Sequence, residues 1–139
     1  MSVEELKRLA QVGLEMWGSN SSTSPHEVFA EDYINHQEPD VTGGISSKNL
    51  EAWKEMVDGH RQAFSDCTVK VLMQIAEGNL VASHWEFEAV HTGTYLGHSA
   101  TGRQVIWTGI QIDRIRDSLI VESWVSWDKS RIFETLGFG

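Results

Sequence analysis

The segment LVASHWEFEAVH, residues 80–91, decides the fold class because its side chains alternate between two kinds. In its middle, Ser83, Trp85, Phe87 and Ala89 occupy one set of positions, and His84, Glu86 and Glu88 occupy the positions between them. Successive side chains of a β-strand point to opposite faces, so this pattern predicts a strand with one buried and one solvated face. His91 is in phase with Trp85, and we expect it to point toward a cavity or its rim.

Further strands flank this segment on both sides. Residues 68–76 precede it across the tight turn 77–79, and residues 104–115 and 119–128 follow it. Residues 116–118 are too few for a crossover connection, so the last two strands form an antiparallel hairpin. The sequence therefore predicts a curved antiparallel sheet of at least four strands.

Two long helices are predicted before the sheet. Ser2, with a glutamate three residues later, has the pattern of a capping box and opens a helix that runs to about Trp17. A second helix begins with a cap at Ser46 or Ser47 and ends near Phe64, where the period changes from helical to two. We expect both helices to pack on the concave side of the sheet.

Shorter elements complete the chain. Pro25 opens a helical turn over residues 25–30, residues 32–37 form an extended stretch or loop, and Gly43-Gly44 is a break. A short helix over residues 129–136 closes the chain. Helices followed by an antiparallel sheet are typical of an α+β domain, and we expect residues 1–139 to form one domain.

Composition excludes several classes of function. Eleven Lys and Arg against 20 Asp and Glu give a net charge of −9, which disfavours nucleic acid and anionic membranes as partners. Cys67 is the single cysteine, so no internal disulfide forms. The longest apolar run is too short to span a membrane, and the acidic N-terminus is unlike a secretory signal. We expect a cytoplasmic protein.

The chain is rich in tryptophan for its size. Four of the six tryptophans fall on predicted strands: Trp85, Trp107, Trp124 and Trp127. Their large apolar surfaces suit either a core and a subunit interface or an aromatic pocket for a flat, apolar organic ligand. The two alternatives are compatible because a sheet has two faces. The apolar area left on one face predicts a homodimer.

Several ordered motifs carry a family resemblance. They are Tyr33-Ile34-Asn35-His36, residues 77–85, residues 91–97, residues 101–103, residues 114–117, residues 120–124, and Asp128 ahead of Leu136-Gly137. In this order they resemble the SnoaL-like polyketide cyclase, or ester cyclase, family. The resemblance implies the nuclear transport factor 2-like fold, a cone made of a curved sheet wrapped by helices and usually dimeric.

The resemblance also implies a chemistry. These cyclases close a ring by an intramolecular aldol reaction without a metal or cofactor, and an Asp on the last strand acts as general acid and base. In this chain the matching position is Val125, which cannot exchange a proton. The fold also hosts isomerases, lyases and non-catalytic binders, so the reaction must be argued from other residues.

Polar residues near the implied pocket are the candidate catalytic groups. His36 matches a family position near the pocket mouth, where an imidazole is a candidate proton carrier, although a loop histidine bonded to backbone would look the same. Gln111 occupies a position where the cyclases carry a polar pocket residue, and its amide is a candidate donor to an oxyanion. The alternative is an exposed strand residue.

Two carboxylates complete the catalytic candidates. Asp113 is in phase with Trp107 and Gln111, so an apolar pocket would raise its pKa toward neutrality, as a general acid requires. Asp128 directly precedes the last predicted helix, and we favour a helix cap over a proton carrier there. Candidate substrate contacts are Tyr33, Trp53, Trp85, His91, Trp107 and Val125.

Three functional hypotheses remain open at this point. The first is a cofactor-free cyclase, isomerase or lyase for an apolar, polyketide-like or ring-containing substrate. The second is a binding domain without catalysis, and the third is a domain that serves self-association. No spacing of His, Cys, Asp or Glu resembles a known metal site. A cavity holding a titratable group with a shifted pKa would favour the first hypothesis, a cavity without polar groups the second, and a filled cone the third.

Overall fold

A single five-stranded sheet carries the fold, with strand order β1-β5-β4-β3-β2. The computed structural model describes residues 1–37 and 46–137. The elements follow in the order α1 (Val3–Glu15), a short 3-10 helix (Pro25–Glu27), β1 (Phe29–Gln37), α2 (Leu50–Ala63), β2 (Phe64–Glu77), β3 (Leu80–His91), β4 (Gln104–Arg116), β5 (Leu119–Trp127) and α3 (Lys129–Leu136).

The antiparallel part of the sheet confirms the predicted strands. β2 pairs with β3, β3 with β4 and β4 with β5, all antiparallel, and β3 has the predicted bounds. Along β3 and β4, buried residues alternate with more exposed ones, as the sequence pattern requires. These strands therefore present one row of side chains to the interior and one to the opposite face.

The prediction of an extended stretch or loop over residues 32–37 is right about the extended backbone but misses the strand. Residues 32–37 belong to a strand that begins at Phe29 and pairs parallel with β5, so the sheet is mixed rather than antiparallel. β1 is an edge strand with a register irregularity between Phe29 and Ile34. Its alternation is therefore weaker than that of β3, and a parallel partner 90 residues away leaves no turn signal in the sequence.

The predicted cap of α1 is confirmed, and the predicted cap of α2 is wrong. Ser2 and Glu5 form the predicted capping box of α1. α2 instead begins after Asn49, whose side chain accepts from the Ala52 amide at 2.8 Å. Ser47 exchanges two backbone hydrogen bonds with Asn35 of β1, both 2.9 Å, and so ties the chain before α2 to the sheet edge. The predicted break at Gly43-Gly44 lies outside the described residues.

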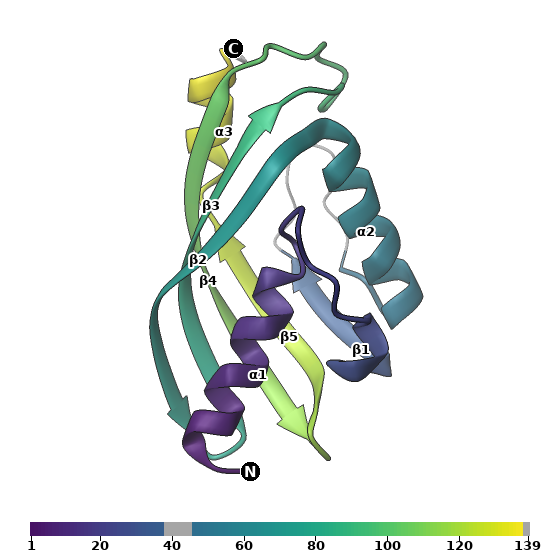
Figure 1. Cartoon of the computed structure of the whole chain (residues 1–139), viewed down its shortest axis with the longest axis vertical. Coiled ribbons are helices and arrows are strands. Elements are labelled where there is room, and N and C mark those ends of the chain that lie inside the picture. Colours follow the sequence, from purple (N-terminus) through teal and green to yellow (C-terminus); the bar gives the residue numbers. More distant parts are fainter. Residues whose placement is uncertain (38–45, 138–139) are drawn as a thin grey trace.

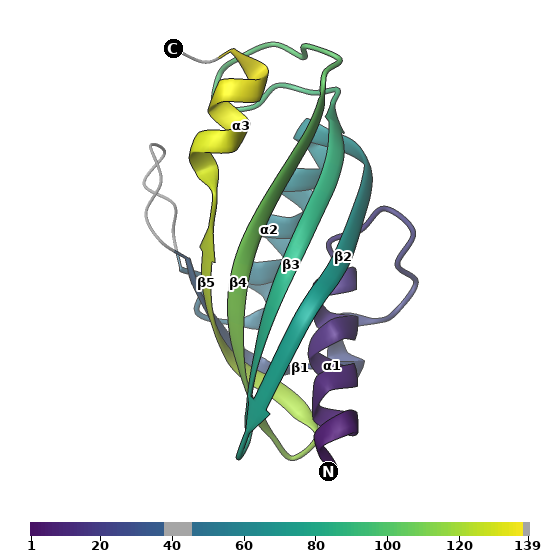
Figure 2. The ribbon, with the colours of Figure 1, turned by 90° about the vertical axis from the view of Figure 1, so that its left-hand side faces the viewer.

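Both long helices lie on one side of the sheet, as predicted. Figure 1 shows α1 and α2 on the same side of the strands, with the chain ends at opposite ends of the molecule. In Figure 2 the opposite face of the strands is uncovered and α2 lies behind it. We call the helix-covered side the concave face and the uncovered side the convex face.

Buried side chains divide the interior into two clusters. One contains Phe29, Tyr33, Trp53, Val81 and Ile120 and lies near the β2–β3 and β4–β5 turns. The other contains Trp85, Phe87, Trp107, Val125 and Ile132, and it borders the cavity described below. Among the described residues, no helix is long and apolar enough to cross a membrane.

Candidate functional site

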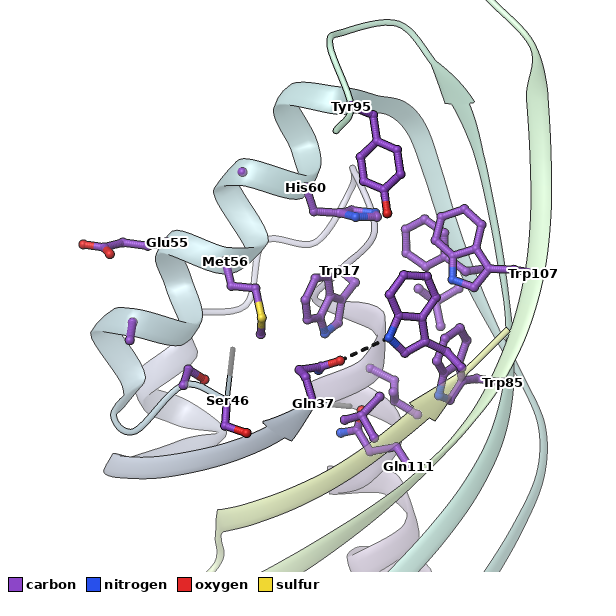
Figure 3. A pocket seen from close by; sticks show the side chains of 18 residues that line it. Trp17, Gln37, Ser46, Glu55, Met56, His60, Trp85, Tyr95, Trp107 and Gln111 are labelled. Carbon is purple, nitrogen blue, oxygen red and sulfur yellow. Dashed lines mark hydrogen bonds between the residues drawn. The ribbon is translucent and has the colours of Figure 1, made fainter. Parts of the chain in front are cut away.

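A cavity of about 550 Å³ lies between the concave face, α2 and the end of α1. Figure 3 shows its side chains. Six of the 18 lining residues are aromatic: Trp17, Trp85, Phe87, Tyr95, Trp107 and Trp127. Of the predicted site residues, Trp85, Trp107, Gln111 and Val125 line it. Few polar groups converge on this apolar lining, which is typical of small-molecule sites.

The strand wall depends on a close approach between β3 and β4. Gly109 faces Trp85 across the strand pair. A Cβ at position 109 would lie 2.3 Å from Cζ2 of the Trp85 indole, so only glycine lets the ring lie over β4. This packing sets the position of one of the largest side chains of the cavity.

The helical wall is held by Arg61 of α2. Its guanidinium donates to the carbonyl oxygens of Met16 at 2.5 Å and Gly18 at 3.0 Å, at the carboxyl end of α1. These bonds fix the segment that carries Trp17. The Trp17 ring meets the His60 ring edge-on, with 5.6 Å between ring centroids.

His60 brings an imidazole into the aromatic lining. It extends from α2 toward the strands (Figure 3), and its ring centroid lies 5.0 Å from those of Phe64 and Phe87. Its Nε2 is shielded from water and has no hydrogen-bond partner within the described part of the chain. Burial, with a smaller contribution from Arg61, lowers the pKa of His60 to about 4. The imidazole is therefore neutral at pH 7.

A carboxylate lies behind the strand wall. Gln111 lines the cavity, and its Nε2 donates to Oδ1 of Asp113 at 2.8 Å. Ser123 of β5 donates to the same oxygen at 2.5 Å. Asp113 is fully buried and does not line the cavity. Burial raises its pKa to about 6, while the bonds from Ser123 and Gln111 oppose that rise.

The bond to Asp113 corrects the predicted role of Gln111. An ionised carboxylate only accepts hydrogen bonds, so the Gln111 amide turns its NH₂ group away from the cavity. The second contact of that nitrogen, to Ser123 Oγ at 3.4 Å, lies on the same side. The carbonyl oxygen, not the NH₂ group, is the Gln111 atom left for a ligand.

A chain of hydrogen bonds joins Asp113 to the far side of the cavity. Trp127 Nε1 donates to Gln37 Oε1 at 3.2 Å (dashed in Figure 3), and Gln37 Nε2 donates to Asn35 Oδ1 at 2.6 Å. Asn35 Nδ2 donates to the Tyr33 hydroxyl at 2.8 Å, and Tyr33 donates to Ser123 Oγ at 2.8 Å. Every donor points toward Asp113, as a negative charge at the end of the chain favours.

Three predicted substrate contacts lie elsewhere. Tyr33 is fully buried in the hydrogen-bond chain, and burial, then the Asp113 charge, raises its pKa. Trp53 packs in the first core cluster against Phe29. His91 is buried beyond the lining, with its Nδ1 3.0 Å from the Thr101 hydroxyl. The predicted cavity contacts at these residues are wrong because their rings fill the core.

Two predicted catalytic residues also lie outside the cavity. His36 is on the convex face, where its Nε2 is 2.7 Å from Glu122 and its ring stacks on Trp124. Its neighbours Asn35 and Gln37 point inward, so alternation turns His36 outward. Asp128 caps α3 and accepts from the Arg131 amide at 3.1 Å, which confirms the cap favoured from the sequence.

Sequence reasoning missed most of the lining, including Gln37, His60 and Trp17, which shape the site. Gln37 is in phase with Tyr33 and Asn35, so alternation would have identified it had β1 been recognised as a strand. His60 lies on the apolar stripe of α2, and such a stripe alone predicts a core position. Trp17 follows the last turn of α1, where no pattern indicates a direction.

In the ranges 1–37 and 46–137, no three His, Cys, Asp or Glu residues are grouped to hold a metal ion.

Solved structures of similar fold cover nearly the whole chain. IdmH from Streptomyces antibioticus, provisionally described as a polyketide cyclase, is 25% identical with a TM-score of 0.82 over 95% of this chain and 98% of its own. AclR from Streptomyces galilaeus, provisionally described as a hydroxylase, is 23% identical with a TM-score of 0.83 over 98% of this chain and 83% of its own. No curated protein sequence matches significantly.

A family model fits the chain at the sequence level. The model of the SnoaL-like polyketide cyclases matches residues 7–136. The matched region spans α1 to α3, and therefore every wall of the cavity. The structural matches agree with the α+β, nuclear transport factor 2-like fold predicted from the sequence. The chain belongs to the SnoaL-like polyketide cyclase family.

Proposed function

We propose that the protein is a cofactor-free enzyme that moves a proton within an apolar, ring-forming or ring-containing substrate held in the cavity. Family membership supports a cyclase-type enzyme for a small molecule. The observation that carries the proposal is the neutral imidazole of His60, which lines the cavity among aromatic side chains. An interior packed with side chains and without a cavity would instead have favoured the hypothesis of a domain that serves self-association alone.

His60 is the group proposed to carry the proton. The ring lines the cavity, and its unprotonated nitrogen takes a proton from the carbon next to a substrate carbonyl. The low pKa of His60 makes the imidazolium short-lived, so it gives up the proton again, either to the bound substrate or to solvent in the cavity. In an isomerisation the proton returns to another carbon, and in an aldol closure it ends on the new alkoxide oxygen.

Gln111 and Asp113 are proposed to orient the substrate. Gln111 contacts the ligand, and Asp113 acts through Gln111 as a positioning residue. Val125 lines the cavity at the position where the resemblance implies an acid, so it contributes surface but no proton. This replacement is the specific observation that favours the alternative function, ligand binding without turnover.

Exchange of the α-protons of 2-tetralone in D₂O, followed by proton NMR, tests the proposal. This bicyclic ketone is a probe for the cavity and carries the C–H group that the mechanism requires. We expect the protein to accelerate the exchange over buffer, and His60→Gln to lower the acceleration at least about tenfold. His36→Ala, which removes a histidine from the convex face, is the matched control and retains the acceleration.

The possible outcomes separate the two functions. Binding of 2-tetralone without accelerated exchange would favour the binding domain over the enzyme. Equal acceleration by a folded His60→Gln variant would remove His60 from the proposed role. Loss of the acceleration in His36→Ala would restore His36 as the proton carrier that the sequence predicted.

We also propose a homodimer that forms through the convex face. Three isoleucines of β4 point away from the cavity there and are exposed: Ile106, Ile110 and Ile112. Met73 and Ile75 of β2 pair with His84 and Ala82 of β3 and extend the same apolar surface. Apolar patches of this kind mark interaction surfaces in soluble proteins.

A further inference from the structure

The hydrogen bond between Gln111 and Asp113 fixes the orientation of a side-chain amide in the cavity wall. Two bonds hold the Gln111 amide: Nε2 to Asp113 at 2.8 Å and Nε2 to Ser123 at 3.4 Å. Both partners are fully buried and absent from the lining. The amide is therefore anchored through its nitrogen from behind the strand wall.

The hydrogen-bond chain removes the alternative orientation. If Gln111 turned its carbonyl oxygen toward ionised Asp113, two acceptors would face each other without a proton between them. Ser123 cannot supply that proton, because its hydroxyl already donates to Asp113 at 2.5 Å and accepts from Tyr33 at 2.8 Å. The buried partners thus fix which end of the amide meets a ligand.

We infer that the cavity selects ligands with a hydrogen-bond donor, a hydroxyl or an enol, at Gln111, because Asp113 holds the amide with its carbonyl oxygen toward the ligand. This inference rests on the cavity of the proposed function but not on turnover. It also fits that function, since the enol form of a ketone carries the required O–H group. A carbonyl or ether oxygen at this position would face another acceptor.

Protonation of Asp113 removes the constraint. A neutral carboxyl with its proton on Oδ1 donates a hydrogen bond to Gln111, and the Gln111 amide then reverses and presents its NH₂ group to the cavity. Among the described residues, the ionisable group that interacts with Asp113 is Tyr33 of β1, which stays neutral because its pKa is raised. β4 and β5 contribute uncharged Gln111 and Ser123, and β3 places Val81 opposite Asp113.

Two probes that share a ring system test the inference by equilibrium dialysis. 2-Naphthol carries a hydroxyl donor, and 2-methoxynaphthalene carries an ether oxygen that only accepts. At pH 8 we expect the wild-type protein to bind 2-naphthol about tenfold more tightly than 2-methoxynaphthalene. Equal affinities, or tighter binding of the ether, would overturn the inference.

Asp113→Asn is the informative variant. The amide of this variant can place either its carbonyl oxygen or its NH₂ group where Gln111 and Ser123 both contact Oδ1 of Asp113, so Gln111 is no longer held in one orientation. We expect the preference for 2-naphthol to disappear in this variant at all pH values. In Ser123→Ala the bond from Gln111 to Asp113 remains, and so does the preference. A folded Asp113→Asn variant that keeps the preference would overturn the inference.

The pH profile of the wild-type protein supplies a test that needs no variant. The preference for 2-naphthol should fall as the pH drops through about 6, the pKa of Asp113. A preference that is constant from pH 8 to pH 5 would contradict the inference even if Asp113→Asn fails to fold. Failure of the exchange assay with an intact naphthol preference would remove the proposed catalysis and leave the selectivity standing.

Discussion

The two faces of one sheet use alternate residues of the same strands and have opposite properties. On β4, Gln111 and Asp113 point to the concave face and are buried. Ile110, the residue before Gln111 on the same strand, points to the convex face, where its side chain is 53% exposed. The two histidines differ in the same way: His60 is enclosed by aromatic rings, and His36 contacts Glu122 at a half-exposed site. The chemical role of a polar residue therefore depends on the face of the sheet on which it lies, and not on its residue type alone.

The largest expected contrast is in the pH dependence of stability. Asp113 has a raised pKa, from 3.8 to about 6, so its contribution to stability falls as the pH rises through this window. His60 has a lowered pKa, from 6.5 to about 4, so its contribution falls as the pH drops through its window. Each corresponds to about 3 kcal/mol, and the two partly cancel in the wild-type protein.

Urea unfolding between pH 4 and 8 separates the two contributions. Relative to the wild-type protein, Asp113→Asn should lose stability as the pH drops from 6 to 4, because only the His60 contribution remains. His60→Gln should gain relative stability over the same range. Parallel curves for all three proteins would show that neither group is held in an apolar interior.

The next contrast concerns packing at neighbouring positions of β4. Gly109→Ala drives a methyl group into the Trp85 indole, and we expect a loss of about 2 kcal/mol together with weaker binding of 2-tetralone. Ile110→Thr, which points to the convex face, should change the stability of the isolated protomer by less than about 0.5 kcal/mol. Thermal unfolding and dialysis of both variants make the comparison, and equal effects would show that the faces are not distinct.

The convex face is expected to control assembly but not binding. Ile110→Glu places a charge in the exposed apolar surface and should convert the homodimer into a monomer at micromolar concentration. Light scattering measures the mass, and affinity for 2-tetralone should be unchanged. A wild-type protein that is already monomeric under these conditions would contradict the proposed interface.

The smallest effect is expected at His36. Its contact with Glu122 is partly exposed, and Glu122 also binds Arg114 at 2.7 Å, so His36→Ala should cost less than about 1 kcal/mol. Chemical denaturation at pH 7 checks this value. A loss of several kcal/mol would mean that the convex cluster is a structural centre rather than a surface contact.

The fold was predictable wherever a long strand has one buried face. β3 and β4 alternate over many residues, so the bounds of β3, the inward direction of Trp85 and the shared face of Trp107 and Gln111 followed from the sequence. β1 was not recognised because its parallel partner is distant in sequence and its register is irregular. The α2 cap moved to Asn49 because Ser47 is used in pairing with β1, a tertiary contact.

The site was only partly predictable because alternation gives a direction but not a volume. Tyr33 and Trp53 point inward like Trp85, yet their rings fill the core and leave no space for a ligand. The hydrogen-bond chain joins β1 to β5 through Tyr33 and Ser123, which are 90 residues apart. The orientation of Gln111 therefore depends on the assembled fold.

The most direct test of the central claim is a ¹H–¹⁵N correlation spectrum of the six tryptophan indole groups during titration with 2-tetralone. Trp17, Trp85, Trp107 and Trp127 line the cavity, and Trp124 lies on the convex face as an internal control. We predict that the signals of the four lining indoles shift together and reach saturation, while the Trp124 signal stays in place. Shifts confined to Trp124, with the lining indoles unmoved at the same ligand concentrations, would contradict the assignment of the concave cavity as the functional site.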